Sequence, residues 1–330
     1  MFLSIIFFIL GLIFLIKGAD IMIDGSSSIA KKFNISSLVI GLTIVAFGTS
    51  APELIVSAVA ALKGSTGIAL GNIIGSNIAN TLLVLGIAAI IYPLIVKKDI
   101  VNKQIPFSLL AIVAVGILIN DFLIDYVSPS SLTRIDGLIL ILFFSIFIYY
   151  TFSISKAKEG VLEGIKEDYR LSGSDEIKTY NNFVSIGMII AGLVGLFLGG
   201  RWVVNGAIDM AKFFGMSEIL IGLTIVAVGT SLPELAASAM AAKKGQADMA
   251  IGNVVGSNIF NLFWVLGVSA IINPITYNLV LNIDMLILLA ITILLLFLIY
   301  TGKRNVLTKK EGITLLVLYI CYLIFLVSRG

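Results

Sequence analysis

The sequence predicts an all-α polytopic membrane protein with ten transmembrane helices in two inverted five-helix repeats. Three observations support this fold class: the composition, a series of long apolar runs, and an internal duplication. The chain is 59% hydrophobic and 12% charged, with a mean hydropathy of +1.10, whereas soluble domains carry about 25% charged residues. In lipid, only helices and closed barrels satisfy the backbone polar groups. The apolar runs lack the alternating polarity of barrel strands, so helices are expected.

Each half of the chain contains five apolar stretches. A spanning helix needs about 20 apolar residues, and we expect spans near 1–16, 36–62, 67–92, 105–120, 134–153, 183–202, 217–242, 248–273, 280–300 and 311–327. Residues 1–16 lack the charged start and small-residue cleavage site of a signal peptide, so we count them as the first span. The hydrophilic stretch after the fifth span predicts a division into a first membrane repeat (1–153), a linker (154–182) and a second membrane repeat (183–330).

The two halves are copies of one another. Shifted by 181 residues, Gly41–Gly86 aligns with Gly222–Gly267 without a gap, and 29 of the 46 positions are identical. Five is an odd number of spans, so the second copy enters the membrane from the opposite side. This inverted arrangement is typical of secondary transporters, whose site lies near the midplane between the repeats.

The basic residues predict the orientation in the membrane. Of the 22 lysines and arginines, 17 lie in the loops after spans one, three, five, seven and nine. Positively charged loops favour the cytoplasmic side. We therefore expect a multi-pass protein of the cell membrane with both termini outside and a cytoplasmic loop 154–182, which we interpret as a solvated linker rather than a regulatory segment.

Several classes of function are disfavoured by the residues that the chain lacks. There is no histidine, and the single cysteine, Cys321, lies in an apolar run. Zinc, copper and haem sites and histidine-based catalysis are therefore not expected, and no nucleophile–base pair indicates an enzyme. The basic residues lie in loops between spans, so they do not indicate a nucleic-acid partner.

Two carboxylates interrupt apolar spans at equivalent positions, Glu53 and Glu234. Ionisable residues inside a membrane are costly and usually mark an ion or substrate path. The alternative, a structural ion pair, lacks a lysine or arginine in a neighbouring span. Pro52 and Pro233 precede these residues, and each removes a helical hydrogen bond, which predicts a broken helix rather than a simple kink.

Polar residues line the same spans at helical spacing. Thr49 and Ser50 share a helix face with Glu53, and Thr230 and Ser231 repeat the pattern beside Glu234. A second motif places polar residues four apart in each half, namely Asn72, Ser76 and Asn80, and Asn253, Ser257 and Asn261. We interpret Ser76, Asn80, Ser257 and Asn261 as candidate cation ligands. For Asn72 and Asn253, helix–helix hydrogen bonding is an equally good interpretation.

The candidate ligands are all oxygens, from carboxylates, hydroxyls and amides. Hard cations take such ligands, and Ca²⁺ accepts six to eight of them in flexible geometry, whereas Mg²⁺ requires a strict octahedron. Two carboxylates neutralise one divalent cation. The candidate ligands therefore favour a hard divalent cation such as calcium, with the lipid bilayer as surroundings and no cofactor.

The paired motifs GTSAPE and GTSLPE, each followed by GNxxGSNxxN, resemble the two alpha-repeats of the sodium/calcium exchangers in the cation/calcium antiporter superfamily. The resemblance covers the whole chain. It implies ten helices, alternating access, and exchange of three sodium ions for one calcium ion in sodium-coupled members. It implies cation ligands at Thr49, Ser50, Glu53, Ser76, Asn80, Thr230, Ser231, Glu234, Ser257 and Asn261, with backbone carbonyls of Ala46 and Ala227 as further ligands. Asn261 departs from the Asp found in some microbial members and in the potassium-dependent branch.

The main prediction is thus a secondary antiporter that exchanges sodium for calcium and functions as a monomer. A proton/calcium or other divalent-cation antiporter of the same superfamily is the alternative, and the gradient that drives calcium flux separates the two. An intramembrane hydrolase would need a nucleophile–base pair, which we do not find. A calcium channel usually builds its pore at an oligomer axis, whereas this site is built within one chain.

Overall fold

The computed structural model describes residues 2–98, 100–124, 126, 129–154, 177–215, 227–301 and 305–329. Within this part of the chain the fold is helical, with only four two-residue strands. Eight helices are long and apolar enough to cross a membrane, and a ninth span is formed if one bent pair of helices is counted. The expected span 217–242 lies partly outside the described residues, so the ten-helix count and the inverted arrangement of the repeats remain predictions.

The first half contains α1 (Phe2–Phe33), a broken span, and three further spans. The broken span consists of α2 (Ser37–Ile40), the π-helix η1 (Gly41–Val45), α3 (Ala46–Thr49) and α4 (Ala51–Leu62). The next span joins α5 (Thr66–Ala79), the π-helix η2 (Asn80–Val84) and α6 (Leu85–Ile91). The π-helix η3 (Ile100–Gln104) leads into α7 (Ile105–Leu118), then come the short α8 (Asp121–Ile124) and the last span α9 (Arg134–Ile154).

The second half repeats this order. It contains α11 (Asn182–Phe213), then α13 (Ala227–Gly229) and α14 (Leu232–Lys243). The next span joins α15 (Ala247–Ile259), the π-helix η5 (Phe260–Val265) and α16 (Leu266–Ile272). A 3-10 turn η6 (Leu279–Leu281) precedes α17 (Asn282–Thr301), and α18 (Lys309–Arg329) ends the chain. Linker residues 155–176 lie outside the described part of the chain.

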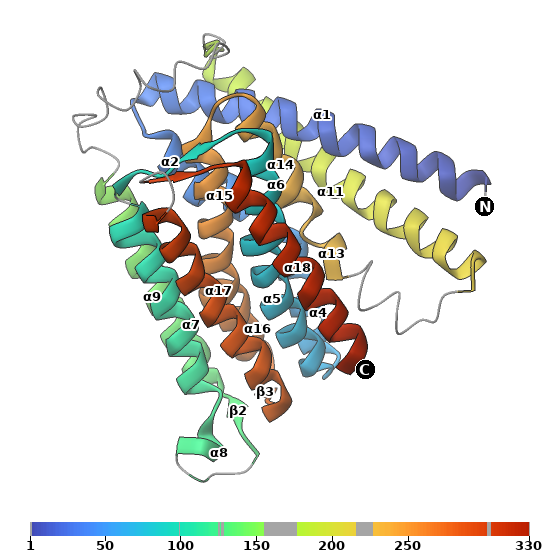
Figure 1. Cartoon of the computed structure of the whole chain (residues 1–330), viewed down its shortest axis with the longest axis vertical. Coiled ribbons are helices and arrows are strands. Elements are labelled where there is room, and N and C mark those ends of the chain that lie inside the picture. Colours follow the sequence, from blue (N-terminus) through green and yellow to red (C-terminus); the bar gives the residue numbers. More distant parts are fainter. Residues whose placement is uncertain are drawn as a thin grey trace.

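The first helix of each half is much longer than expected. We predicted spans of 1–16 and 183–202 from the apolar runs, but α1 continues to Phe33 and α11 to Phe213. The two helices lie side by side along one edge of the bundle (Figure 1). Their backbones touch at glycines, since a methyl group on Gly192 would lie 2.6 Å from the carbonyl oxygen of Gly18. This close contact continues beyond the apolar run, where Gly25 packs against Ser185, and it accounts for the extra helical turns.

The spans at the centre of the bundle are those that carry the second polar motif. In their most apolar windows, 78% of the residues of α5–η2–α6 and of α15–η5–α16 are buried, against 22% for α18. The halves also interlock, because α9 packs on α16 and α18 packs on α6. Strand β1 (Leu94–Ile95) pairs with β4 (Val306–Leu307), and β2 (Ser131–Leu132) pairs with β3 (Ile275–Thr276). Each of these strand pairs joins one half to the other.

Candidate cation site

Two helix breaks place the glutamates at the centre of the molecule. The first broken span bends by 45° where α3 ends and α4 begins, which confirms the break predicted from Pro52. In the second half α13 ends at Gly229 and α14 begins at Leu232. Each proline occupies the first turn of the new helix, where its missing N–H costs nothing. Glu53 and Glu234 therefore lie in the first turns of α4 and α14, at helix N-termini that favour negative charge.

Both glutamates are fully buried, and each lies near a hydroxyl group from the other half of the chain, Ser50 for Glu234 and Thr230 for Glu53. The hydroxyl of Ser50 donates to Oε1 of Glu234 at 2.7 Å, and Ser257 Oγ lies 3.5 Å from the same oxygen. Ser76 and Thr230 are the hydroxyl neighbours of Glu53, and their own oxygens are 3.2 Å apart. The structure thus brings these six candidate residues together from both repeats.

Several oxygens of the candidate ligands are buried without a hydrogen-bond partner among the described residues. They include both carboxylate oxygens of Glu53, Oε2 of Glu234, the hydroxyl of Ser231, and the amide oxygens of Asn80 and Asn261. Buried polar atoms are normally paired, and an unpaired one costs free energy. A cation bound among them would satisfy acceptors that the protein leaves unpaired.

The structure gives less support to the two backbone carbonyl candidates, Ala46 and Ala227. The carbonyl of Ala46 accepts the Ser50 N–H at 3.0 Å and the Thr49 hydroxyl at 3.4 Å. A carbonyl oxygen has two lone pairs, so the Ala46 oxygen already accepts as many hydrogen bonds as it has lone pairs. Ala227 is the first residue of α13, and residues 216–226 before it lie outside the described part of the chain. The hydroxyl of Thr49 also donates to Oδ1 of Asn253 at 3.1 Å.

Asn72 and Asn253 tie helices together. The amide of Asn253 donates to Ser238 Oγ at 2.9 Å and to the backbone carbonyl of Glu234 at 3.3 Å. Asn72 makes the matching bonds to Ser57 Oγ at 3.1 Å and to the carbonyl of Glu53 at 3.5 Å. Each asparagine thereby joins a glutamate-bearing helix to the next one, which favours the helix-contact interpretation of these two residues.

Five polar residues near the site were not singled out from the sequence: Ser57, Ser238, Asn77, Asn258 and Thr81. Both serines and both asparagines are identical between the repeats and polar within apolar spans, and this signal could have identified them. Asn77 and Asn258 lie where α5 meets α15, and the amide of Asn77 donates to the backbone carbonyl of Asn258 at 3.1 Å. Thr81 has no counterpart, because Leu262 occupies the equivalent position.

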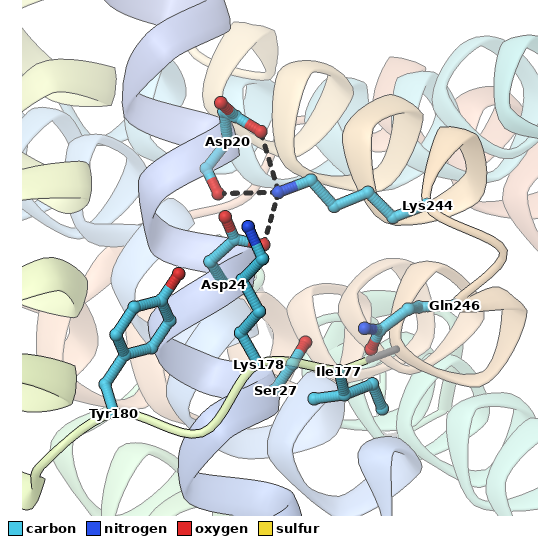
Figure 2. A pocket seen from close by; sticks show the side chains of 8 residues that line it. All are labelled: Asp20, Asp24, Ser27, Ile177, Lys178, Tyr180, Lys244 and Gln246. Carbon is cyan, nitrogen blue, oxygen red and sulfur yellow. Dashed lines mark hydrogen bonds and ion pairs between the residues drawn. The ribbon is translucent and has the colours of Figure 1, made fainter. Parts of the chain in front are cut away.

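A second polar cluster lies at the far end of α14, ten residues and therefore roughly 15 Å along the helix from Glu234. Figure 2 shows the ammonium group of Lys244 between Asp20 and Asp24 of α1. It lies 2.7 Å from Oδ1 of Asp20, 2.5 Å from Oδ1 of Asp24 and 3.1 Å from the carbonyl of Asp20. These residues line a cavity of about 250 Å³ together with Tyr180 and Gln246. The cluster joins α1 to the end of α14.

Comparison with known proteins identifies the relatives of the chain. The sequence model of the family described as "Sodium/calcium exchanger protein" matches residues 3–153 and 184–328. A protein of Alkalimonas amylolytica that is named as an antiporter, CaxA, is 40% identical over 99% of this chain and 100% of its own length. Sodium/calcium exchanger MaX1 of Methanosarcina acetivorans is 31% identical over 96% and 97% of the two chains. The fold is similar to solved structures of the sodium-calcium exchanger NCX_Mj, with a TM-score of 0.79 and 36% identity over 97% of both chains in one of them.

Proposed function

Because the chain belongs to the sodium/calcium exchanger family, we propose that it exchanges sodium for calcium across the membrane by alternating access. The observation that carries the proposal is the pair of fully buried glutamates, Glu53 and Glu234, surrounded by neutral oxygens from both halves. Two carboxylates match the charge of one calcium ion. Sodium accepts the same hard oxygen ligands.

The proposed ligands are the residues implied by the sequence motifs. Glu53 and Glu234 supply charge, and neutral oxygens come from Thr49, Ser50, Ser76, Asn80, Thr230, Ser231, Ser257 and Asn261, with the carbonyls of Ala46 and Ala227. The buried unpaired oxygens of Glu53, Glu234, Ser231, Asn80 and Asn261 support this assignment. All of these residues belong to one chain, which is consistent with a functional monomer.

The duplication gives a physical basis for alternating access. Two copies of opposite orientation build equivalent routes to one site from the two sides of the membrane. The hydrogen bond from Ser50 to Glu234 crosses between the copies, so a movement of one copy against the other changes the ligand set and the exposure of the site together. We place the site near the membrane midplane, where such broken helices occur in transporters.

The decisive experiment separates sodium coupling from proton coupling. Purified protein is reconstituted in liposomes, and calcium uptake is driven by an outward sodium gradient at equal pH on both sides. We expect saturable uptake that stops when choline replaces sodium inside. Uptake that follows an outward proton gradient and ignores sodium would instead establish the proton/calcium antiporter.

The same proposal includes an orientation, with both termini outside and the loop 154–182 in the cytoplasm. It rests on the excess of lysine and arginine in the loops on one face. Single cysteines introduced between 160 and 175, in a Cys321→Ser background, should react with an impermeant thiol reagent only after cells are permeabilised. Labelling of intact cells would show that the orientation is the reverse of the proposed one, and it would leave the proposed exchange function untouched.

A further inference from the structure

Asn77 connects the two halves beside the proposed cation site. It is fully buried on α5, and its side chain makes two hydrogen bonds to the other half. Its amide nitrogen donates to the backbone carbonyl of Asn258 at 3.1 Å. Its amide oxygen accepts from the amide nitrogen of Asn261 at 3.0 Å.

The backbone carbonyl fixes the direction of this chain of hydrogen bonds. A carbonyl oxygen only accepts hydrogen bonds, so the amide nitrogen of Asn77 must face Asn258. The amide oxygen of Asn77 then faces Asn261 and requires a donor there. Asn261 must therefore turn its nitrogen toward Asn77, which leaves its oxygen, buried and without a partner among the described residues, on the opposite side of its amide group.

We propose that Asn77 is a positioning residue that holds Asn261 with its amide oxygen available to the cation. Because Asn77 presents an oxygen to position 261, it favours an amide over a carboxylate as the side chain there. The inference rests on the proposed exchange function. An aspartate at 261 would place a carboxylate oxygen against the amide oxygen of Asn77, and neither could donate. The site therefore keeps two carboxylates, and its ligands at 261 and 80 remain neutral.

Asn80, the counterpart of Asn261 in the first half, is not held by an equivalent hydrogen bond within the described part of the chain. Asn258, the repeat counterpart of Asn77, donates to the hydroxyl of Thr81 at 2.9 Å, and Thr81 in turn donates to the carbonyl of Asn77. The amide of Asn80, the counterpart of Asn261, has no hydrogen-bond partner among the described residues. In the second half, the position equivalent to Thr81 is occupied by Leu262, which offers no hydroxyl. Asn80 is therefore a matched control for Asn261.

The first test compares two carboxylate substitutions without transport. Asn261→Asp and Asn80→Asp add the same charge at equivalent positions, and thermal unfolding is measured in detergent at mildly alkaline pH without divalent cations. We expect Asn261→Asp to lower the unfolding midpoint more than Asn80→Asp. In an Asn77→Leu background, where the opposing oxygen is gone, the difference should disappear. Equal effects in the parent protein, or a difference that persists with Asn77→Leu, would overturn the proposal.

The second test reads the orientation of Asn261 from calcium transport. Asn77→Leu should raise the apparent KM for calcium about tenfold, equivalent to about 1.4 kcal/mol, with a smaller change in maximal rate. Thr81→Val removes hydrogen bonds at the same contact but leaves the side-chain bonds of Asn77, and it should preserve the KM. If Asn77→Leu does not fold, Asn77→Ser replaces it.

The outcomes separate the two proposals. A parent protein that exchanges calcium for sodium, with an unchanged KM in the Asn77 variants, would reject the positioning role alone. A parent protein without sodium-dependent calcium flux would reject the proposed function, while the comparison of unfolding midpoints would still test the polarity of the hydrogen bonds.

Discussion

At the scale of single residues, the two glutamates differ although the repeats make them equivalent. Glu234 accepts a short hydrogen bond from Ser50, whereas neither oxygen of Glu53 is paired with a described residue. The serines differ in the same way, because the hydroxyl of Ser231, the counterpart of Ser50, is buried without a partner. The duplicated sequence therefore builds a site whose two halves hold their charges differently.

We expect Glu53→Gln and Glu234→Gln each to abolish most of the calcium exchange. Each substitution leaves one carboxylate against a divalent ion and removes a charge-assisted contact, worth about 1.5–3 kcal/mol or about 10–100-fold in affinity. Calcium uptake by proteoliposomes measures the effect. Glu311→Gln, at the start of α18, is the control for loss of a carboxylate elsewhere. Parent-like uptake by both site variants would move the cation site away from these residues.

The difference between the serines predicts an unequal response to alanine. Ser50→Ala removes a buried hydrogen bond to a carboxylate, which costs about 1.5–3 kcal/mol, whereas Ser231→Ala removes none. In calcium-free detergent, Ser50→Ala should therefore lower the unfolding midpoint more than Ser231→Ala. Equal midpoints without calcium would contradict the assigned hydrogen bond.

At the scale of helices, α1 and α11 form one closely packed pair. Gly192 tests this contact, because a methyl group there would lie 2.6 Å from the carbonyl of Gly18, and the backbones must separate to admit it. We expect Gly192→Ala to destabilise the protein by about 1–3 kcal/mol, as overpacking does. Gly187→Ala on the same helix meets no atom within 4 Å and should be neutral or slightly stabilising. Thermal unfolding distinguishes the two, and equal effects would refute the close contact.

The ion-pair cluster of Lys244 distinguishes one end of the bundle from the other. The repeat counterparts of Lys244, Asp20 and Asp24 are Lys63, Arg201 and Asn205, which include no carboxylate. The α1–α14 tether therefore cannot form at the equivalent place in the other half. On the face that we propose to be cytoplasmic, α1 is thus held to the bundle by a contact with no charge-paired counterpart.

We expect Lys244→Met to destabilise the folded protein, because it breaks the α1–α14 tether and leaves the carboxylates of Asp20 and Asp24 facing one another. Partly exposed ion pairs contribute up to about 1 kcal/mol each, so the fall in the unfolding midpoint should be modest. Asp20→Asn combined with Lys244→Met should recover part of it, because one of the repelling charges is removed. A double variant less stable than Lys244→Met would show that Asp20 and Asp24 do not repel one another once the lysine charge is removed.

The same elements show what the sequence could predict. The broken helices at Pro52 and the buried position of Glu53 and Glu234 follow from residue type and spacing alone. The length of α1 did not, because Lys17, Asp20 and Asp24 end the apolar run, while glycine contacts with α11 and the distant Lys244 stabilise the helix beyond it. The orientation of Asn261 depends on Asn77 from the other half of the chain, whose amide nitrogen bonds to the backbone carbonyl of Asn258. No local sequence pattern reveals this contact.

At the scale of the whole molecule, the charge of the site determines what crosses the membrane in each cycle. Two glutamates and a calcium ion form a neutral complex. Three sodium ions, the number expected from the family resemblance, would leave one positive charge in excess, and unbalanced charge in a low-dielectric site is costly. Neutral oxygens such as those of Asn80 and Asn261 would have to spread this excess, and neither asparagine supplies the extra carboxylate that we associate with potassium dependence.

We therefore expect transport that is independent of potassium and electrogenic, with one net positive charge moving in the direction of sodium. Calcium uptake by sodium-loaded proteoliposomes should be unchanged when choline replaces potassium. With the potential then clamped by a potassium ionophore, an interior-positive potential should accelerate uptake and an interior-negative one should slow it, because sodium leaves with the excess charge. A strict requirement for potassium would mean that the amide at 261 does not set the ion choice. Uptake that ignores the clamped potential would mean that two sodium ions, rather than three, balance each calcium ion.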